Sequence, residues 1–219
     1  MSEAAVPAPL VKPLLRGVSH QVAFFAALAG TAVLVDMAPS TRGAWAAAIY
    51  GISLCAMFGT SASYHRPTWQ PRARAWMRRA DHAAIFVLIA GTYTPFALLI
   101  ERDNGPLMLW VAWGGALAGV LQSLFWVHAP RPVSAFLYLL LGWASVFFLP
   151  RIVAVTGMSF VWLLGGGGLV YSAGAVIYAL RRPNPAPKVF GYHEIFHVLV
   201  IIAAALHYAA EILVVRRLT

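Results

Sequence analysis

The sequence predicts an all-α integral membrane protein, a bundle of seven transmembrane helices. Of the 219 residues, 61% are hydrophobic and only 11% are charged, about half the charged share of an ordinary soluble domain. Apolar runs of 17 to 23 residues recur along the whole chain, and each is long enough to cross about 30 Å of hydrocarbon. The connections between them are short, so the sequence contains no stretch for a separate soluble domain.

Each apolar run is interpreted as one span. In chain order the predicted spans are residues 18–37, 44–64, 82–100, 107–127, 133–149, 158–180 and 195–215. The first run lacks a small-residue cleavage site and is followed by six more, so we expect a span there and not a signal peptide. Residues 1–15 are rich in Pro and Ala and are expected to form a disordered cytoplasmic tail. Residues 16–219 then form a single membrane domain.

The net charge of +9 is explained by membrane topology, and no nucleic-acid partner is expected. With the N-terminus inside, the inner segments carry 11 of the 16 Lys and Arg residues and the outer segments carry 5. This bias predicts a cytoplasmic N-terminus and a C-terminus outside. The inner loop 66–79 interleaves arginines with Trp69, Trp76 and Met77. That composition suits contact with anionic lipid headgroups.

The string GYHEIFH near the C-terminus contains the H-E-x-x-H pattern of zinc proteases. Its spacing places His193 and His197 on one helical face, one turn apart, where both can bind one ion. Ser61 and His65 have the same spacing at the end of the second span, and Asp81 begins the third. Under the predicted topology, all these positions lie at the cytoplasmic ends of their helices.

The three histidines His65, His193 and His197, together with one water, would complete a tetrahedral zinc site of the open kind found in catalytic centres. Asp81 could hold the water or accept a hydrogen bond from an imidazole N–H. The alternative is that each histidine is an isolated interior residue with its own hydrogen bond. Because ionisable groups inside spans are unfavourable, their convergence at one membrane level favours the shared site.

The zinc protease interpretation of H-E-x-x-H fails on its downstream sequence. Metzincins continue with a glycine and a third histidine, where this chain has Val200 and Ala203. Farther downstream, Glu211 lies 14 residues beyond His197, about 21 Å along a helix. The third ligand must therefore come from upstream, and His65 is the best candidate.

Three sequence blocks carry a resemblance to a known family. They are GTSASYHR at 59–66, ADHAAIFVLIAGTYTPF at 80–96 and GYHEIFHVLVIIAAALHY at 191–208. These blocks resemble the signature blocks of the hemolysin III family, the bacterial branch of the progestin and adipoQ receptors, which include the adiponectin receptors. The resemblance covers essentially the whole chain.

The resemblance implies seven spans with the N-terminus inside and a location in the cell membrane, for a bacterium the inner membrane. It also implies one zinc ion bound by His65, His193 and His197. Ser61 and Asp81 would lie near the metal-bound water. At these positions the sequence does not depart from the family pattern.

A membrane-embedded zinc with an open position predicts hydrolysis of a lipid amide or ester near the cytoplasmic face. In this hypothesis Asp81, or alternatively Glu194, moves protons and Ser61 orients the water. The family's similarity to alkaline ceramidases, and the ceramidase activity attributed to adiponectin receptors, point to the same chemistry. Two alternatives are open: a pore-forming or haemolytic protein causing cytolysis, as the family name implies, and a non-catalytic sensor of membrane homeostasis with a structural zinc.

A second polar pair lies farther along the last span. His207 and Glu211 are four residues apart and remote from the predicted zinc site. They are interpreted as a structural hydrogen-bonded pair, with a proton-linked role as the alternative.

Overall fold

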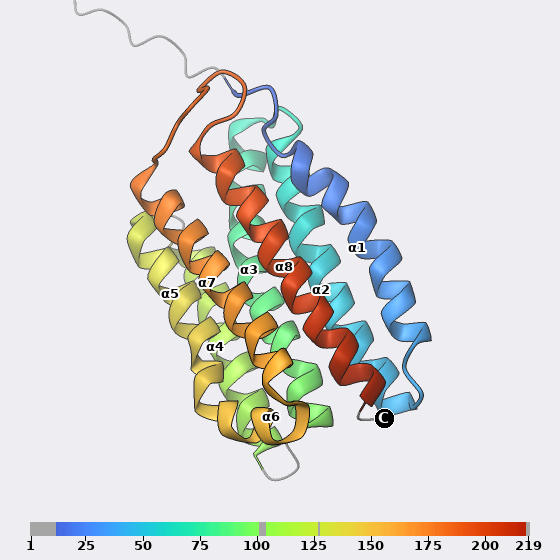
Figure 1. Ribbon diagram of the computed structural model, residues 1–219. Coiled ribbons are helices and arrows are strands. Elements are labelled where there is room, and N and C mark those ends of the chain that lie inside the picture. Colours follow the sequence, from blue (N-terminus) through green and yellow to red (C-terminus); the bar gives the residue numbers. More distant parts are fainter. Residues whose placement is uncertain (1–11, 101–103, 127, 218–219) are drawn as a thin grey trace, which may run out of the picture.

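A computed structural model describes residues 12–100, 104–126 and 128–217, and this part of the chain is almost entirely helical. Seven helical segments are long and apolar enough to cross a membrane, which confirms the predicted fold class. Figure 1 shows the long helices packed side by side, with the start of α1 and the end of α8 at opposite ends of the bundle. The direction of the bundle in the membrane stays a prediction.

The helices follow one another with short connections. Their bounds are α1 (Val18–Asp36), α2 (Thr41–His65), α3 (Pro71–Leu99), α4 (Gly105–Phe125), α5 (Arg131–Trp143), α6 (Leu149–Thr156), α7 (Met158–Leu180) and α8 (Tyr192–Arg217), with the 3-10 helix η1 (Ala144–Phe148) between α5 and α6. The stretch α5–η1–α6 acts as one span. Each of the seven predicted spans therefore corresponds to one helical segment.

Helix α3 begins eleven residues earlier than predicted, at Pro71 instead of residue 82. Proline is well suited to a first helical turn because its missing N–H would have no partner there, and the following Ala, Arg and Met residues favour helix. The prediction of a loop over residues 66–79 is therefore wrong. Of these residues, 66–70 are non-helical, and 71–79 belong to α3. As a result, Asp81 lies ten residues inside α3, about three turns from its start.

The fifth span continues past its predicted end at residue 149. Helix α5 stops at Trp143, and the chain passes through η1 before α6 resumes the helix to Thr156. Pro150 explains the interruption, because it cannot donate to the carbonyl four residues earlier and its ring clashes with that group. Arg151, which was expected in a connection, is therefore an exposed residue of α6.

The segment before α1 packs on the loop between α7 and α8. The backbone N–H groups of Leu14 and Leu15 donate to the carbonyl oxygens of Lys188 and Val189, at 3.0 and 3.2 Å. Of the predicted disordered tail 1–15, residues 1–11 lie outside the described residues. The remaining part of that tail is attached to the bundle.

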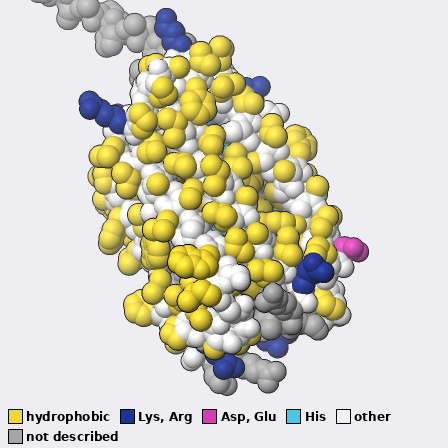
Figure 2. All heavy atoms as spheres, viewed as in Figure 1, with side chains coloured by type: hydrophobic (Ala, Val, Ile, Leu, Met, Phe, Trp, Pro, Cys, Tyr) yellow, Lys and Arg dark blue, Asp and Glu magenta, His cyan; other side chains and the backbone are white. Residues whose placement is uncertain are grey.

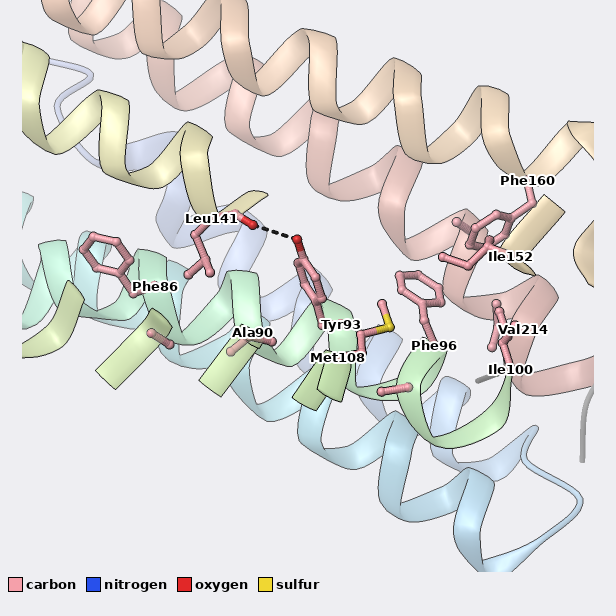
Figure 3. Close-up of a cluster of buried hydrophobic side chains, with 14 residues drawn as sticks. Phe86, Ala90, Tyr93, Phe96, Ile100, Met108, Leu141, Ile152, Phe160 and Val214 are labelled. Atoms are coloured by element: carbon pink, nitrogen blue, oxygen red, sulfur yellow. Dashed lines mark hydrogen bonds between the residues drawn. The ribbon is translucent and has the colours of Figure 1, made fainter. Parts of the chain in front are cut away.

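The core consists of two clusters of buried side chains that share α3 and α8. One cluster joins α3 to α4, α5, α6, α7 and the end of α8, and Figure 3 shows its aromatic members Phe86, Tyr93, Phe96 and Phe160. The Tyr93 hydroxyl donates to the carbonyl oxygen of Leu141 at 2.7 Å. The other cluster joins α1, α2, α3 and α8. Helices α3 and α8 therefore pack against other helices in both clusters.

The outside of the bundle is largely apolar on the face that Figure 2 shows. Figure 2 shows hydrophobic side chains across the middle of one face, with the charged side chains near the two ends. Large exposed residues such as Phe25, Trp110, Phe147 and Trp162 are each more than half exposed. A soluble protein rarely exposes so much contiguous apolar surface, whereas hydrocarbon matches it.

Candidate metal centre

The three predicted histidines meet where the end of α2 approaches the start of α8. His65 is the last residue of α2, and His193 and His197 lie one turn apart in the first two turns of α8. One ring nitrogen from each lies within 4.8 Å of the others, and the Nε2 atoms of His65 and His193 are 3.1 Å apart. This cluster, which we call the histidine triad, could hold a metal ion.

The chemistry of the triad fits a metal. His197 is 1% exposed, and its Nδ1 atom has no hydrogen-bond partner among the described residues. A buried imidazole nitrogen is normally satisfied, so an orphaned one in a member of the triad shows that the described side chains alone do not complete this site. Imidazole donors of this kind suit divalent transition metals.

Both predicted supporting residues lie beside the triad. The Asp81 Oδ2 atom is 3.8 Å from the Nε2 atom of His65. Ser61, one turn before His65 on α2, is buried, and its hydroxyl interacts with the Asp81 carboxylate. Because α3 begins at Pro71, Asp81 projects from within a helix and not from a loop.

A fourth histidine, which the sequence analysis did not select, packs directly on the triad. The ring of His20 on α1 stacks on that of His197, with centroids 3.8 Å apart and planes inclined by 9°. Its Nδ1 atom is 2.8 Å from the Ser61 hydroxyl oxygen, and its Nε2 atom is 3.3 Å from the backbone carbonyl oxygen of His197. His20 therefore orients a triad member and Ser61 together. His20 lies at the cytoplasmic end of the first predicted span, and this position was the sequence feature that could have identified it.

Gly17 is a second residue that sequence reasoning missed. It precedes α1 with φ of 78°, in the left-handed region that favours glycine. A Cβ atom at this position would lie 2.7 Å from the Cβ atom of His65. The absence of a side chain lets the start of α1 reach the triad.

Glu194 lies between the two triad residues of α8 in sequence, but its carboxylate has other partners. Its Oε1 atom pairs with the Nε atom of Arg16 at 2.5 Å, and its Oε2 atom accepts the Gly191 N–H at 2.8 Å. The second bond satisfies a donor at the start of α8, as the glutamate of a capping box does. Glu194 thus links the starts of α1 and α8.

The triad lines a cavity of about 510 Å³, which we call the polar cavity. Asp81, Ser61 and His20 line it as well. A smaller apolar cavity of about 170 Å³ lies between α3, α5, α7 and α8. The two cavities have lining residues in common, namely Tyr138, Phe196 and Val200.

The predicted hydrogen-bonded pair on α8 does not form. The Nε2 atom of His207 is 3.1 Å from the carbonyl oxygen of Leu164 and donates to it. Glu211 is fully buried, and neither of its carboxylate oxygens has a hydrogen-bond partner among the described residues. His207 and Glu211 therefore do not bond to each other, although they lie on neighbouring turns of α8.

Seven membrane-spanning helices and a buried histidine triad at one end define a multi-pass protein of the cell membrane. The chain belongs to the family described as Haemolysin-III related, whose sequence model matches residues 9–208. This confirms the predicted membership of the hemolysin III branch within the progestin and adipoQ receptor superfamily.

Individual relatives span bacteria and animals. The chain is 29% identical to the Hemolysin-3 homolog of Bacillus subtilis, over 86% of this chain and 87% of that protein. It is 32% identical to Hemolysin-3 of Bacillus cereus, over 72% and 69%. It is 28% identical to the human monocyte to macrophage differentiation factor, over 88% and 79%.

Proposed function

We propose that this protein is a zinc-dependent hydrolase that cleaves an amide or ester bond of a membrane lipid. The observation that carries the proposal is the contact between the two cavities, because the polar cavity holds the histidine triad and the apolar one adjoins it at Tyr138, Phe196 and Val200. A lipid could place its reacting carbonyl beside the triad and an acyl chain in the apolar cavity. Ligand sites commonly combine an apolar wall with a few convergent polar groups.

His65, His193 and His197 would hold the zinc, and the fit rests on three ring nitrogens, one from each, that lie within 4.8 Å of one another. Zinc bound to three imidazoles lowers the pKa of a bound water towards about 7 and polarises a carbonyl. His20 would keep the ring of His197 in place by stacking on it.

Asp81 is assigned the proton transfers. Hydrolysis adds a hydroxyl group to the acyl carbon and a hydrogen to the departing nitrogen or oxygen, so one group can accept the proton of water and then donate it. The Asp81 Oδ2 atom, 3.8 Å from His65 Nε2, is close enough to the triad for this role. Ser61 would orient the Asp81 carboxylate. The Glu194 carboxylate is already engaged by Arg16 and Gly191, which favours Asp81 over Glu194.

The test compares the wild type with Asp81→Asn for release of fatty acid from a panel of lipid amides and esters, measured by mass spectrometry. We expect Asp81→Asn to keep its metal and lose turnover by a factor of about 100 to 10,000, the usual contribution of a positioned acid or base. Unchanged turnover would remove Asp81 from the mechanism. A fully metal-loaded wild type that cleaves no lipid would favour the structural-zinc sensor.

A pore-forming or haemolytic role is the second candidate, favoured by the names of the two Bacillus relatives. It predicts ion conductance when the purified chain is added to planar lipid bilayers. Silent bilayers with a correctly folded protein would count against it. The sensor hypothesis predicts a membrane phenotype that persists in Asp81→Asn.

A further inference from the structure

The polar cavity has an unusual charge for a site expected to take a neutral lipid amide. Its lining includes four arginines, Arg16, Arg74, Arg78 and Arg131, against one carboxylate, Asp81. They come from the segment before α1, from α3 and from α5, so separate parts of the fold direct cationic side chains at one volume. The cavity therefore carries an excess of positive charge.

Part of this charge has no ion-pair partner among the described residues. Among the described residues, only Arg16 of the four forms an ion pair, with Glu194. Arg131 donates from Nη1 to the Tyr192 hydroxyl at 3.1 Å and lies 5.5 Å from the ring centroid of Tyr178. These are neutral contacts, which position a guanidinium group without cancelling its charge.

The other two arginines differ in their neighbours. Arg74 lies 5.9 Å from the ring centroid of Tyr64. Arg78 precedes Asp81 by three residues and lies on the same face of α3, so the single carboxylate of the cavity offsets part of its charge. The pKa of nearby Lys12 is lowered, first by partial burial and then by the charges of Arg66, Arg74 and Arg16. Cations at this end of the bundle thus repel one another in the absence of an anion.

The positive-inside bias accounts for basic residues at this end, but not for their placement in the cavity. Arg72 lies on α3 two residues before Arg74 and is exposed, yet it does not line the cavity. One more feature of the lining points to a ligand. The buried Tyr138 hydroxyl, where the two cavities adjoin, has no hydrogen-bond partner among the described residues.

We propose that the polar cavity binds a phosphate group, and that the substrate of the hydrolase is a phosphate-bearing lipid and not a neutral one. This inference rests on the proposed function. Guanidinium groups recognise phosphate oxygens with paired, charge-assisted hydrogen bonds. Arg74, Arg78 and Arg131 would bind the phosphate, and Tyr138 would donate to the ligand where the headgroup gives way to the acyl chain.

The test is calorimetric titration of the full chain in a neutral detergent, on an Asp81→Asn background so that bound ester is not hydrolysed. Three probes separate the sources of phosphate: dihexanoyl phosphatidic acid, dihexanoylglycerol with the same chains but no phosphate, and inorganic phosphate. We expect phosphatidic acid to bind at least about tenfold more tightly than the diglyceride, the effect of one charge-assisted hydrogen bond. Inorganic phosphate that binds as tightly as phosphatidic acid would support the site and assign it to a soluble phosphate compound. Equal binding of the two lipids would overturn the proposal.

Three variants locate the binding. Arg78→Gln and Arg131→Gln should each weaken phosphatidic acid binding about tenfold, whereas Arg72→Gln should leave it unchanged. A loss in Arg72→Gln as large as in the cavity variants would mean general surface attraction and would overturn the site. If Arg131→Gln misfolds because it loses Tyr192, Arg78→Gln still decides.

The outcomes separate this proposal from the hydrolase itself. Phosphatidic acid binding by a wild type that cleaves no lipid would support the phosphate site and contradict the hydrolase. Cleavage of a neutral lipid by the wild type, without phosphatidic acid binding, would do the reverse.

Discussion

Helix α8 carries two pairs of polar residues at the same four-residue spacing, and they have different surroundings. His193 and His197, at its start, meet His65 from α2 within 4.8 Å. His207 and Glu211, farther along the helix, meet no such partner group: His207 bonds to a backbone carbonyl, and both Glu211 oxygens are unpaired among the described residues. The spacing places two side chains on one face, but only neighbouring helices can turn that face into a site.

The neighbours of the two pairs explain the contrast. Near the start of α8, the adjoining segments present polar groups, including Ser61, Asp81 and His20. Around Glu211, the adjacent buried residues of α8 are Ala210, Val214 and Val215, and the nearby Tyr50 hydroxyl of α2 makes no hydrogen bond to the carboxylate. The same motif therefore meets several converging polar side chains at one place and mostly apolar side chains, with one unbonded tyrosine hydroxyl, at the other.

The largest expected difference between the two pairs is in metal binding. His197→Ala should lose essentially all bound metal, because it removes one of three ligands. His207→Ala removes a partly buried histidine from the same helix and should keep the wild-type metal content. Elemental mass spectrometry on detergent-purified protein measures both, with His65→Ala as a further ligand variant. Metal retained in His197→Ala would show that the triad is not the site.

The two buried glutamates of α8 should respond to substitution with opposite signs. Glu194→Met leaves Arg16 without its partner and Gly191 without its acceptor, so the free energy of unfolding should fall by about 3 kcal/mol. Unfolding by sodium dodecyl sulfate in mixed micelles measures it. A stability equal to that of the wild type would show that the link between α1 and α8 contributes little.

His20→Phe should weaken metal binding without removing a ligand. The phenyl ring can still stack on His197 but cannot bond to Ser61, and lost support of this kind typically lowers metal affinity by a factor of about 10 to 100. Competition with a fluorescent zinc chelator measures the change. His20→Phe with wild-type affinity would reduce His20 to a packing residue.

The smallest expected effect is a gain. Glu211→Met replaces an unpaired buried carboxyl with an apolar side chain of similar length, and removal of that desolvation penalty should stabilise the protein by about 1 kcal/mol. The same unfolding titration detects the change. A loss of stability would indicate that Glu211 has a bound partner in the membrane.

Most of the fold and the triad were predictable because they depend on regular patterns. Apolar run length predicts the spans, and the bias of basic residues predicts which ends lie together. His65, Asp81, His193 and His197 were predicted to form one site because all four lie at the cytoplasmic ends of their predicted helices. The start of α3 was missed because Pro71 to Arg79 is polar, so hydropathy marks where the apolar run begins and not where the helix begins.

Contacts between helices could not be predicted in this way. The stacking of His20 on His197 and the close approach of Gly17 to His65 depend on how α1 packs, and a single sequence does not determine that geometry. The neutral partners of Arg131 could not be predicted either, because both lie on other helices. Tyr178 lies in α7, and Tyr192 is the first residue of α8.

The histidine triad joins parts of the chain that leave the ribosome far apart in time. His20 and the carbonyl of His197 are 177 residues apart, and His65 and His193 are 128 residues apart. The histidines can meet only after the last helix has entered the membrane. Metal uptake would therefore mark the end of biogenesis instead of assisting its early steps, and a chain arrested before α8 would keep His20, Ser61, His65 and Asp81 without a metal site.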